Sequence, residues 1–291
     1  MSGSTVFSPR TRLALIAKKR LGGTLGVLLK KAIARPRYKQ QLKVAREGFR
    51  QYGDRYKHNV LYVAGMPKSG TTWLDSMLAT VPGYAEVMLP EAVDHELRHQ
   101  ETLSFQLPQD TFARLKDTLT VLRLHAAGSD NNIRVLEENK VPYVVLYRDL
   151  RDVAVSHHYY VAQTPWHPEF SKYQGKTVQE GVRVFADDLL QKHVDWIRSW
   201  RRQADSPLCE IVTYEQMRED SNEVLLRIFK HYGIPDAERL APAAVEANTF
   251  EKLSGGGKDS FFRKGKVGDW VNHFPADLIP VYEKAVEDAL R

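Results

Sequence analysis

A lysine lies inside a short glycine-bounded loop at residues 65–70 (GMPKSG). Apolar residues 60–64 precede the loop as a short buried strand, and apolar residues at helical spacing begin after Thr71 or Thr72. A strand, a glycine-containing loop and a helix N-terminus together form an anion site, because free backbone N–H groups and the positive end of the helix dipole converge there. We therefore expect this loop, with Lys68, to hold a phosphate.

The spacing of Gly65 and Gly70 is that of a nucleotide-triphosphatase P-loop, but the lysine is displaced. That motif reads G-x-x-x-x-G-K-[ST], with the lysine directly after the second glycine, whereas Thr71 and Thr72 follow here. No apolar strand ending in aspartate offers a ligand for Mg²⁺, and no Cys/His cluster suggests zinc. The sequence thus argues against ATP hydrolysis and predicts no bound metal, with a P-loop kinase or nucleotidase as the rival enzyme class.

A second candidate anion site lies within residues 141–160. The apolar run 141–147 predicts a buried strand, which places Arg148 at its carboxyl end, where open α/β sheets bind ligands. Ser156 follows about two helical turns later, so that both side chains reach one anion from one side. The alternative is that Arg148 pairs with Asp149 or Asp152 and that Ser156 is an ordinary helix serine.

A third basic stretch occupies residues 261–270 (FFRKGKVGDW). Arg263, Lys264 and Lys266 surround Gly265, which combines cationic side chains with a backbone that permits close approach. The arrangement suits an anion clamp, although a basic loop of this kind, taken alone, is usually just surface.

Three motifs in this order resemble the sulfotransferase family, whose donor is 3′-phosphoadenosine 5′-phosphosulfate (PAPS). They are PKSGTTW at 67–73, RDLRDVAVS at 148–156 and RKGKVGDW at 263–270. The resemblance extends over residues 58–275 and implies an α/β fold with a central parallel β-sheet flanked by helices, in a P-loop-like nucleotide-binding architecture.

The resemblance also implies which residues contact each part of PAPS. For the 5′-phosphosulfate they are Lys68, Ser69, Gly70, Thr71 and Thr72. For the 3′-phosphate they are Arg148 and Ser156, with Arg263, Lys264 and Gly265 closing over it. For the adenine they are Trp73, Tyr214 and one residue among Asn248, Thr249 and Phe250.

Transfer of a sulfuryl group to a hydroxyl acceptor needs a general base, and His125 is the best candidate among ten histidines. It ends a β-rich stretch on the same edge of the sheet as the loop, and a histidine near its usual pKa of about 6.5 accepts a proton at neutral pH. The family motif Lys-Thr-His-Leu-Pro is only partly matched, because Arg123 replaces the lysine and the proline is absent. Lys68 is expected to stabilise charge on the leaving phosphate, and His157 and His158 are weaker rivals as base.

Apolar runs alternate with helical periodicity along the rest of the chain, which predicts a parallel sheet with helices on both faces. The expected strands are 60–64, 118–124, 141–147 and 208–213, and the expected helices begin at 71 or 72 and span 133–139, 150–161, 185–200, 222–232 and 277–290.

Positive charge is concentrated at the N-terminus. Residues 1–57 contain 15 Lys and Arg but two Asp and Glu, whereas the remaining 234 residues contain 27 basic and 34 acidic side chains. We therefore divide the chain into a basic, helix-compatible arm (1–57) and a sulfotransferase domain (58–291), and the acidic balance of the domain argues against nucleic acid as a partner. The basic amphipathic pattern within residues 1–50 suits peripheral contact with an anionic membrane, and a solvated helix packed on the domain or a tail is the alternative.

A single cysteine, Cys209, indicates a reducing compartment, so we expect a cytoplasmic location, with the membrane surface as the alternative. The C-terminal dimer motif of cytosolic family members, Lys-x-x-x-Thr-Val-x-x-x-Glu, is absent after Trp270, which leaves the oligomeric state open. The expected acceptor is a small molecule or saccharide with a hydroxyl group, bound by residues 85–118 and 162–180. A catalytically inactive protein that binds PAP(S) or a membrane is the last alternative.

Overall fold

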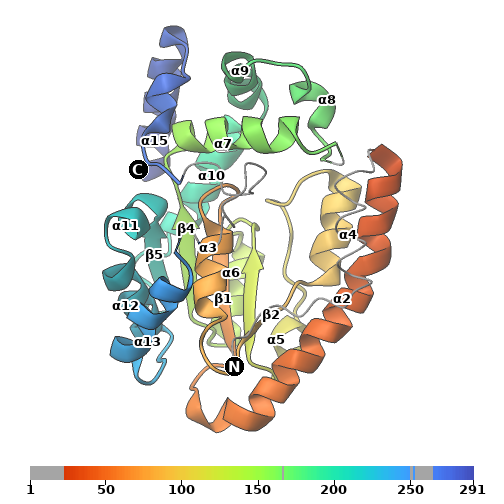
Figure 1. The fold of residues 1–291 in the computed structure, drawn as a ribbon, viewed down its shortest axis with the longest axis vertical. Coiled ribbons are helices and arrows are strands. Elements are labelled where there is room, and N and C mark those ends of the chain that lie inside the picture. Colours follow the sequence, from red (N-terminus) through yellow and green to blue (C-terminus); the bar gives the residue numbers. More distant parts are fainter. Residues whose placement is uncertain (1–22, 166, 250–251, 253–264) are drawn as a thin grey trace.

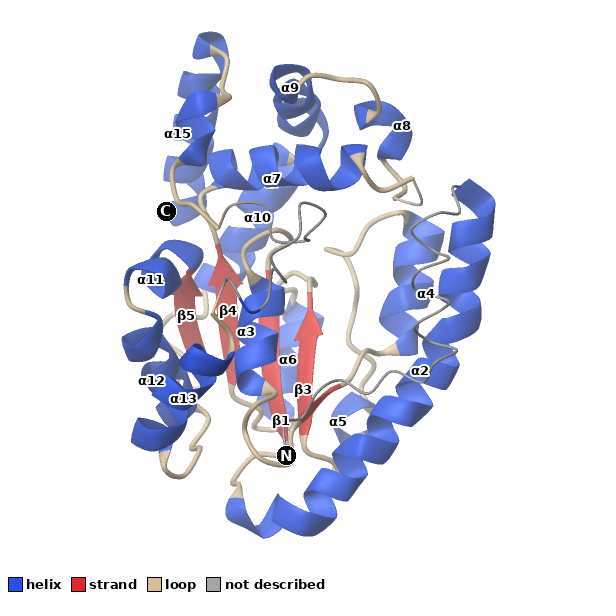
Figure 2. Cartoon of the chain, viewed as in Figure 1, coloured by secondary structure: helices blue, strands red, loops and turns tan. Residues whose placement is uncertain are grey.

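The structure is a computed structural model that describes residues 23–165, 167–249, 252 and 265–291. Five strands form one sheet in the order β2-β3-β1-β4-β5, and every neighbouring pair is parallel (Figure 2). The predicted central parallel sheet is confirmed. The strands are β1 (Val60–Gly65), β2 (Ala85–Glu86), β3 (Thr120–Leu124), β4 (Tyr143–Tyr147) and β5 (Cys209–Thr213).

Helices connect the strands and cover both faces of the sheet (Figure 1). The α-helices are α2 (Gly23–Tyr52), α3 (Thr71–Leu78), α4 (Pro90–His99), α5 (Thr111–Arg114), α6 (Asp130–Glu138), α7 (Leu150–Ala162), α8 (Phe170–Tyr173), α9 (Val178–Asp188), α10 (Leu190–Arg201), α11 (Tyr214–Glu219), α12 (Ser221–His231), α13 (Ala237–Ala247) and α15 (Ile279–Leu290). Short 3₁₀ helices are η1 (Gly53–Arg55), η2 (Asp269–Asn272) and η3 (Ala276–Leu278).

Alternate residues of β1 enter two separate cores, because successive side chains of a strand point to opposite faces. Leu61 and Val63 pack with apolar residues of α3, α12 and α13. Val60, Tyr62 and Ala64 pack with residues of α2, α6, α7 and α10 on the other face. With both faces covered, β1 is buried along its whole length, which explains its continuous apolar sequence.

The strand register brings distant polar residues to one edge of the sheet. Ala64 pairs with Leu124 of β3, and Gly65 pairs with Leu146 of β4. The loop after β1 therefore begins beside the residue that follows β3 and the residues that follow β4. All these strand ends point toward α7, which crosses above them in Figure 1.

The long helix α2 packs on this domain, although its sequence lies in the basic arm. Ala34, Leu42 and Ala45 are buried, and the Ala45 carbonyl accepts a hydrogen bond from the Leu119 amide at 3.0 Å. Gly48 lies against the Gly83 backbone, where an added Cβ would clash. The described part of the arm is thus a helix packed on the domain, while the division at residue 57 stays a prediction. Within the described ranges, no helix has the length and apolar composition needed to span a bilayer.

The predicted single helix over residues 185–200 is wrong, because two helices, α9 and α10, meet at Leu189. The backbone of Leu189 leaves helical geometry, with φ −127° and ψ −27°. Helix α9 packs on α7, whereas α10 packs on α15. The change of direction lets each helix bury its own apolar face, and the periodicity on either side of Leu189 does not reveal it.

Candidate active site

The loop after β1 has the backbone geometry of a close-fitting anion cradle. Lys68 and Gly70 both have left-handed conformations, with φ of 68° and 86°. A Cβ added at Gly70 would lie 2.6 Å from Cδ2 of Tyr214, so no larger residue fits there. The first N–H groups of α3, at Thr71 and Thr72, have no acceptor within the helix and point out of its N-terminus.

Ser69 is buried, and its hydroxyl stabilises the loop itself. The Oγ atom donates to the carbonyl of Met66 at 2.5 Å and also lies 3.2 Å from the carbonyl of Leu146 on β4. This hydroxyl therefore fastens the loop to the neighbouring strand, and its contact with the phosphosulfate stays a prediction.

Lys68 extends from the loop toward α7. Its Nζ atom lies 4.1 Å from the centre of the Tyr160 ring, a cation–π contact. Burial, together with the positive charge of Arg148, lowers the pKa of Lys68 to about 7. Sequence reasoning missed Tyr160, although it lies four residues beyond Ser156 on the same helix, a spacing that places both on one side of α7.

His125 lies at the end of β3, beside the loop, as predicted. Its Nδ1 atom bonds to the carbonyl of Gly65, so Nδ1 carries the hydrogen, because a carbonyl oxygen only accepts. Nε2 is consequently the unprotonated nitrogen and accepts a hydrogen bond from Nη1 of Arg123 at 3.3 Å. Burial and the Arg123 charge lower the pKa of His125 to about 3, which keeps the imidazole neutral.

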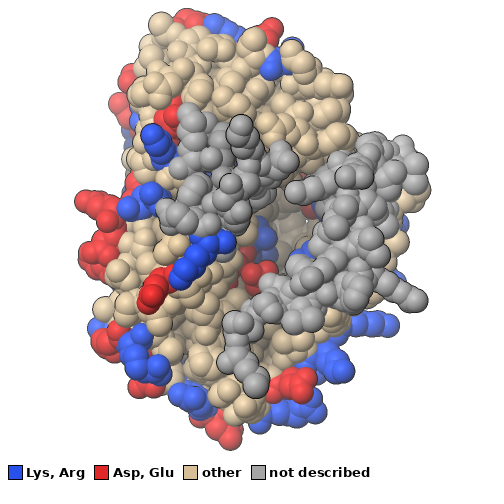
Figure 3. Space-filling view, in the orientation of Figure 1, with Lys and Arg blue, Asp and Glu red and all other residues tan. Residues whose placement is uncertain are grey.

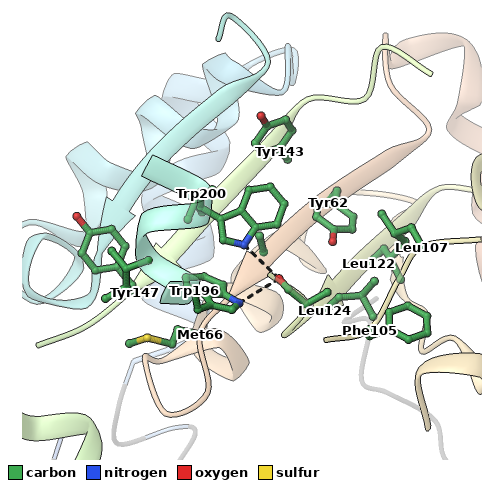
Figure 4. Packing of buried hydrophobic residues seen from close by; sticks show 14 of the residues in the cluster. Tyr62, Met66, Phe105, Leu107, Leu122, Leu124, Tyr143, Tyr147, Trp196 and Trp200 are labelled. Atoms are coloured by element: carbon green, nitrogen blue, oxygen red, sulfur yellow. Dashed lines mark hydrogen bonds between the residues drawn. The ribbon is translucent and has the colours of Figure 1, made fainter. Parts of the chain in front are cut away.

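Two tryptophans of α10 hold the backbone that follows β3 (Figure 4). The Nε1 atom of Trp196 donates to the carbonyl oxygens of His125, at 2.7 Å, and Ala126, at 3.0 Å. The Nε1 atom of Trp200 donates to the same Ala126 oxygen at 3.1 Å. These bonds fix the position of His125 from outside the site. No local pattern predicts them, because the partners are about 70 residues apart in the chain.

Arg123 links His125 to helix α3. Its Nε atom lies 2.5 Å from Oδ2 of the buried Asp75, and its Nη1 lies 3.3 Å from Oγ1 of Thr71. One guanidinium therefore contacts α3, the predicted phosphosulfate residue Thr71 and the imidazole of His125. Arg123 occupies the place of the motif lysine, and its longer, forked side chain makes contacts that a lysine cannot duplicate.

Arg148 is buried at the end of β4, over an aromatic wall. Its Cζ atom lies 4.3 Å from the centre of the Tyr214 ring, and Tyr214 meets Trp73 edge-on at 6.4 Å. The Nη2 atom of Arg148 donates to Oδ2 of Asp152 at 3.1 Å, so the expected alternative pairing with Asp152 is present. Its Nε atom is buried and has no hydrogen-bond partner among the described residues. A buried N–H of a guanidinium without a partner fits a ligand anion.

The remaining predicted site residues either have few side-chain contacts or lie outside the residues that the structure describes. Ser156 is half-buried on α7, with no hydrogen bond of its side chain within the described ranges. Thr249 follows Asn248, whose carbonyl accepts a hydrogen bond from Nε1 of Trp73 at 2.9 Å. Gly265 has φ 60°, a conformation that favours glycine. Phe250, Arg263 and Lys264 lie outside the described residues.

The two rival histidines serve packing. His157 is buried, with Nε2 3.1 Å from Oε2 of Glu169, and its ring contacts Tyr173. His158 is buried against Gly181, where any added Cβ would clash with the imidazole. Neither bonds to the loop after β1.

The arrangement defines a P-loop-like α/β protein with cationic side chains at the carboxyl edge of its sheet. A parallel sheet leads from β1 into the glycine-bounded loop, and Lys68, His125 and Arg148 follow its strand ends. Residues 59–291 match the sulfotransferase domain family. The chain belongs to this family and is a sulfotransferase, which confirms the family indicated by the three motifs.

Relatives of similar sequence and structures of similar fold are found at low sequence identity. Sulfotransferase 1E1 of Cavia porcellus is 22% identical over 265 residues, which cover 79% of this chain and 83% of that protein. The flavonol 3-sulfotransferase of Flaveria bidentis is 22% identical over 274 residues, which cover 80% of this chain and 82% of that protein. The crystal structure of mouse sulfotransferase SULT7A1 complexed with PAP has a TM-score of 0.61 at 17% identity, covering 84% of this chain and 90% of that chain. Retinol dehydratase in complex with androsterone and inactive cofactor PAP has a TM-score of 0.59 at 19% identity, covering 84% of this chain and 86% of that chain.

Proposed function

We propose that this sulfotransferase moves the sulfuryl group of PAPS to a hydroxyl acceptor, with His125 as general base and Lys68 beside the leaving phosphate. The observation that carries the proposal is the bond from Nδ1 of His125 to the Gly65 carbonyl. It joins the end of β3 to the start of the loop and leaves Nε2 as the basic nitrogen next to Lys68. Membership in the family and two similar structures complexed with PAP support PAPS as the donor.

The residues of the chain fit PAPS at both ends. The N-terminus of α3 and Lys68 suit the 5′-phosphosulfate, because backbone N–H groups and an ammonium converge there. The Nε of Arg148, which has no hydrogen-bond partner within the described ranges, suits the 3′-phosphate, and the rings of Trp73 and Tyr214 beside it suit the adenine. When bound, PAPS supplies the electrophilic sulfuryl group.

His125 and Lys68 have different roles in the proposed transfer, since His125 accepts a proton and Lys68 stabilises negative charge. Neutral Nε2 of His125 accepts the proton of the acceptor hydroxyl once that hydroxyl replaces Nη1 of Arg123 as its hydrogen-bond partner. The Gly65 carbonyl holds the ring in the tautomer that this requires. Lys68 in its ammonium form stabilises negative charge on the departing phosphate oxygen. An anion bound beside these two groups raises both pKa values, which favours protonated Lys68 and makes His125 a stronger base.

The direct test uses PAPS carrying labelled sulfate and a panel of phenols, aliphatic alcohols, lipids and saccharides. We expect label to move to at least one hydroxyl compound and the His125→Ala variant to lose transfer while still binding PAP (adenosine 3′,5′-bisphosphate). Lys192→Ala, an exposed change on α10, is the control that should keep full activity. Full activity of His125→Ala would refute its role as base. Stabilisation by ATP with Mg²⁺, but not by PAP in EDTA, would favour a kinase or nucleotidase.

The acceptor is proposed to be a small molecule whose hydroxyl reaches the space between Lys68 and His125. Tyr160 on α7 and His167 line this region, with ring centres 5.6 Å apart, and the Lys30–Glu96 ion pair joins α2 to α4 nearby. Relatives named for flavonol, and structures that hold androsterone or retinol, support a ring-bearing or lipid-like alcohol. The acceptor panel decides between these compounds and saccharides.

Peripheral contact with an anionic membrane is proposed for the outer face of α2. Its exposed basic side chains recur at three- and four-residue intervals, and Figure 3 shows Lys and Arg atoms along the lower right edge where α2 runs. They are Lys31, Arg35, Lys39, Lys43, Arg46 and Arg50.

Sedimentation of the full chain with phosphatidylserine vesicles tests this contact. Changing Lys39, Lys43 and Arg50 to Gln should abolish binding at low salt, whereas a matched change of the exposed Lys140, Arg202 and Lys284 to Gln should not. Equal loss in both variants would contradict a site on α2, and binding that persists in 1 M salt would contradict an electrostatic contact.

A further inference from the structure

One buried carboxylate joins the second and third motifs. Both Asp152 oxygens accept hydrogen bonds, Oδ2 from the Gly268 amide at 2.8 Å and Oδ1 from the Trp270 amide at 3.0 Å. Oδ2 also accepts from Nη2 of Arg148 at 3.1 Å. The Asp152 side chain is 1% exposed, so these three bonds form away from water.

Arg148 completes the junction from the other side. The same Nη2 atom that bonds Asp152 donates to the backbone carbonyl of Lys266 at 2.7 Å. Arg148 and Asp152 thus hold both ends of the segment 266–270, while Arg151 stacks over the Trp270 ring at 4.1 Å. Residues 148–152 and 266–270 are linked through side chain and backbone despite lying about 118 positions apart.

The occupied Nη2 atom determines which donors of Arg148 remain for a ligand. With Nη2 bonded to Asp152 and Lys266, the guanidinium is held in one orientation, and its Nε, which has no partner among the described residues, remains for an anion. Tyr214 fixes the plane of the group from one face, and Asp152 fixes its direction within that plane.

We propose that Asp152 is a positioning residue for the 3′-phosphate, because it orients Arg148 and fastens the segment 266–270 beside it. The inference rests on the proposed use of PAPS. Charge alone predicts the opposite effect, since a carboxylate repels a phosphate and its removal would then tighten binding. Because Asp152 is saturated by three donors, orientation outweighs that repulsion.

The test compares PAP with adenosine 5′-phosphate, which lacks the 3′-phosphate, by calorimetric titration. In the Asp152→Asn variant we expect the preference for PAP to fall by about tenfold, the size of one lost charge-assisted contact, with the affinity for adenosine 5′-phosphate unchanged. The KM for PAPS should rise while kcat stays within about threefold. Glu210→Gln, which breaks the ion pair between Glu210 of β5 and Arg227 of α12, is the control and should change neither nucleotide's affinity.

The outcomes separate the two proposals. If Arg148→Ala keeps the preference for PAP, the assignment of the 3′-phosphate to Arg148 fails. If Arg148→Ala loses the preference but Asp152→Asn keeps or increases it, the role of Asp152 alone is overturned. Equal weakening of both nucleotides in Asp152→Asn would show a structural role only, which also overturns it.

Amide hydrogen exchange tests the proposal in the protein without any substitution, so the result does not depend on whether a variant folds. The Gly268 and Trp270 amides should be protected in the free protein, and PAP should slow their exchange more than adenosine 5′-phosphate does. Unprotected amides, or equal slowing by the two nucleotides, would contradict the proposal.

Discussion

Replacing Gly70 with alanine should damage nucleotide binding through Tyr214. Gly70 has φ 86° and ψ 16° at the start of α3, and an added Cβ would lie 2.6 Å from Cδ2 and 2.9 Å from Cε2 of the Tyr214 ring. That ring carries Arg148 on its face and meets Trp73 at its edge. The substitution therefore pushes on the aromatic wall of the proposed nucleotide site.

The expected effect of Gly70→Ala has two parts, a backbone cost and a displacement of the Tyr214 ring, and a comparison with Gly175→Ala separates them. A left-handed alanine costs about 1–2 kcal/mol of stability relative to glycine. The ring must also retreat by about 0.8 Å to reach ordinary van der Waals contact. Gly175 has a similar φ of 73°, but nothing lies within 4 Å of its added Cβ. Gly175→Ala therefore has the backbone cost alone.

Chemical denaturation and calorimetric titration with PAP measure these two parts. Both variants should lose about 1–2 kcal/mol of unfolding free energy, with the larger loss for Gly70→Ala. Only Gly70→Ala should weaken PAP, by about tenfold or more, which corresponds to about 1.4 kcal/mol. Equal PAP affinity in the two variants would refute the argument that the Gly70–Tyr214 contact shapes the site.

The further predictions concern three ionisable groups. As pH rises through about 7, Lys68 loses its proton in the free enzyme, so kcat/KM for PAPS should fall by up to about tenfold per pH unit. Lys68→Arg should move that limb to higher pH, and a flat profile from pH 6 to 9 would contradict the assignment. His125→Ala should lower kcat by about 10²–10⁴-fold with PAP affinity within about twofold, measured by labelled transfer and titration. Because its pKa is about 3 in the free protein, His125 stays neutral there between pH 7 and 5, and a fall of kcat/KM for PAPS with a midpoint near 6.5 that His125→Ala abolishes would contradict this. Burial raises the pKa of Cys209 to about 12, so at pH 8 about one thiol in ten thousand is ionised, and iodoacetamide should label it only in denaturant. Rapid labelling of the folded protein would show that Cys209 is accessible.

The central strands β1 and β4 were predictable from sequence because their burial is continuous, whereas the two-residue, half-buried strand β2 was not predicted. β1 and β4 are covered on both faces, and their apolar runs show it directly. The same logic placed the loop, His125 and Arg148 on one edge, since parallel strands end together. The prediction of one helix over residues 185–200 was wrong because periodicity shows which face of a helix is buried but not the direction of its axis. That direction changes at Leu189.

The sequence by itself determined the class of protein, because its three motifs and the alternation of strands and helices are local patterns. It also determined that a lysine, a histidine and an arginine follow strands of one parallel sheet. Only the tertiary structure decided which partners these side chains have. The Gly65 carbonyl sets the tautomer of His125. The ring of Tyr160 makes a cation–π contact with Lys68, and Asp152 accepts a hydrogen bond from Arg148. Apart from the four-residue step from Arg148 to Asp152, these contacts join residues far apart in the chain, and packing rather than spacing brings them within hydrogen-bonding or stacking distance.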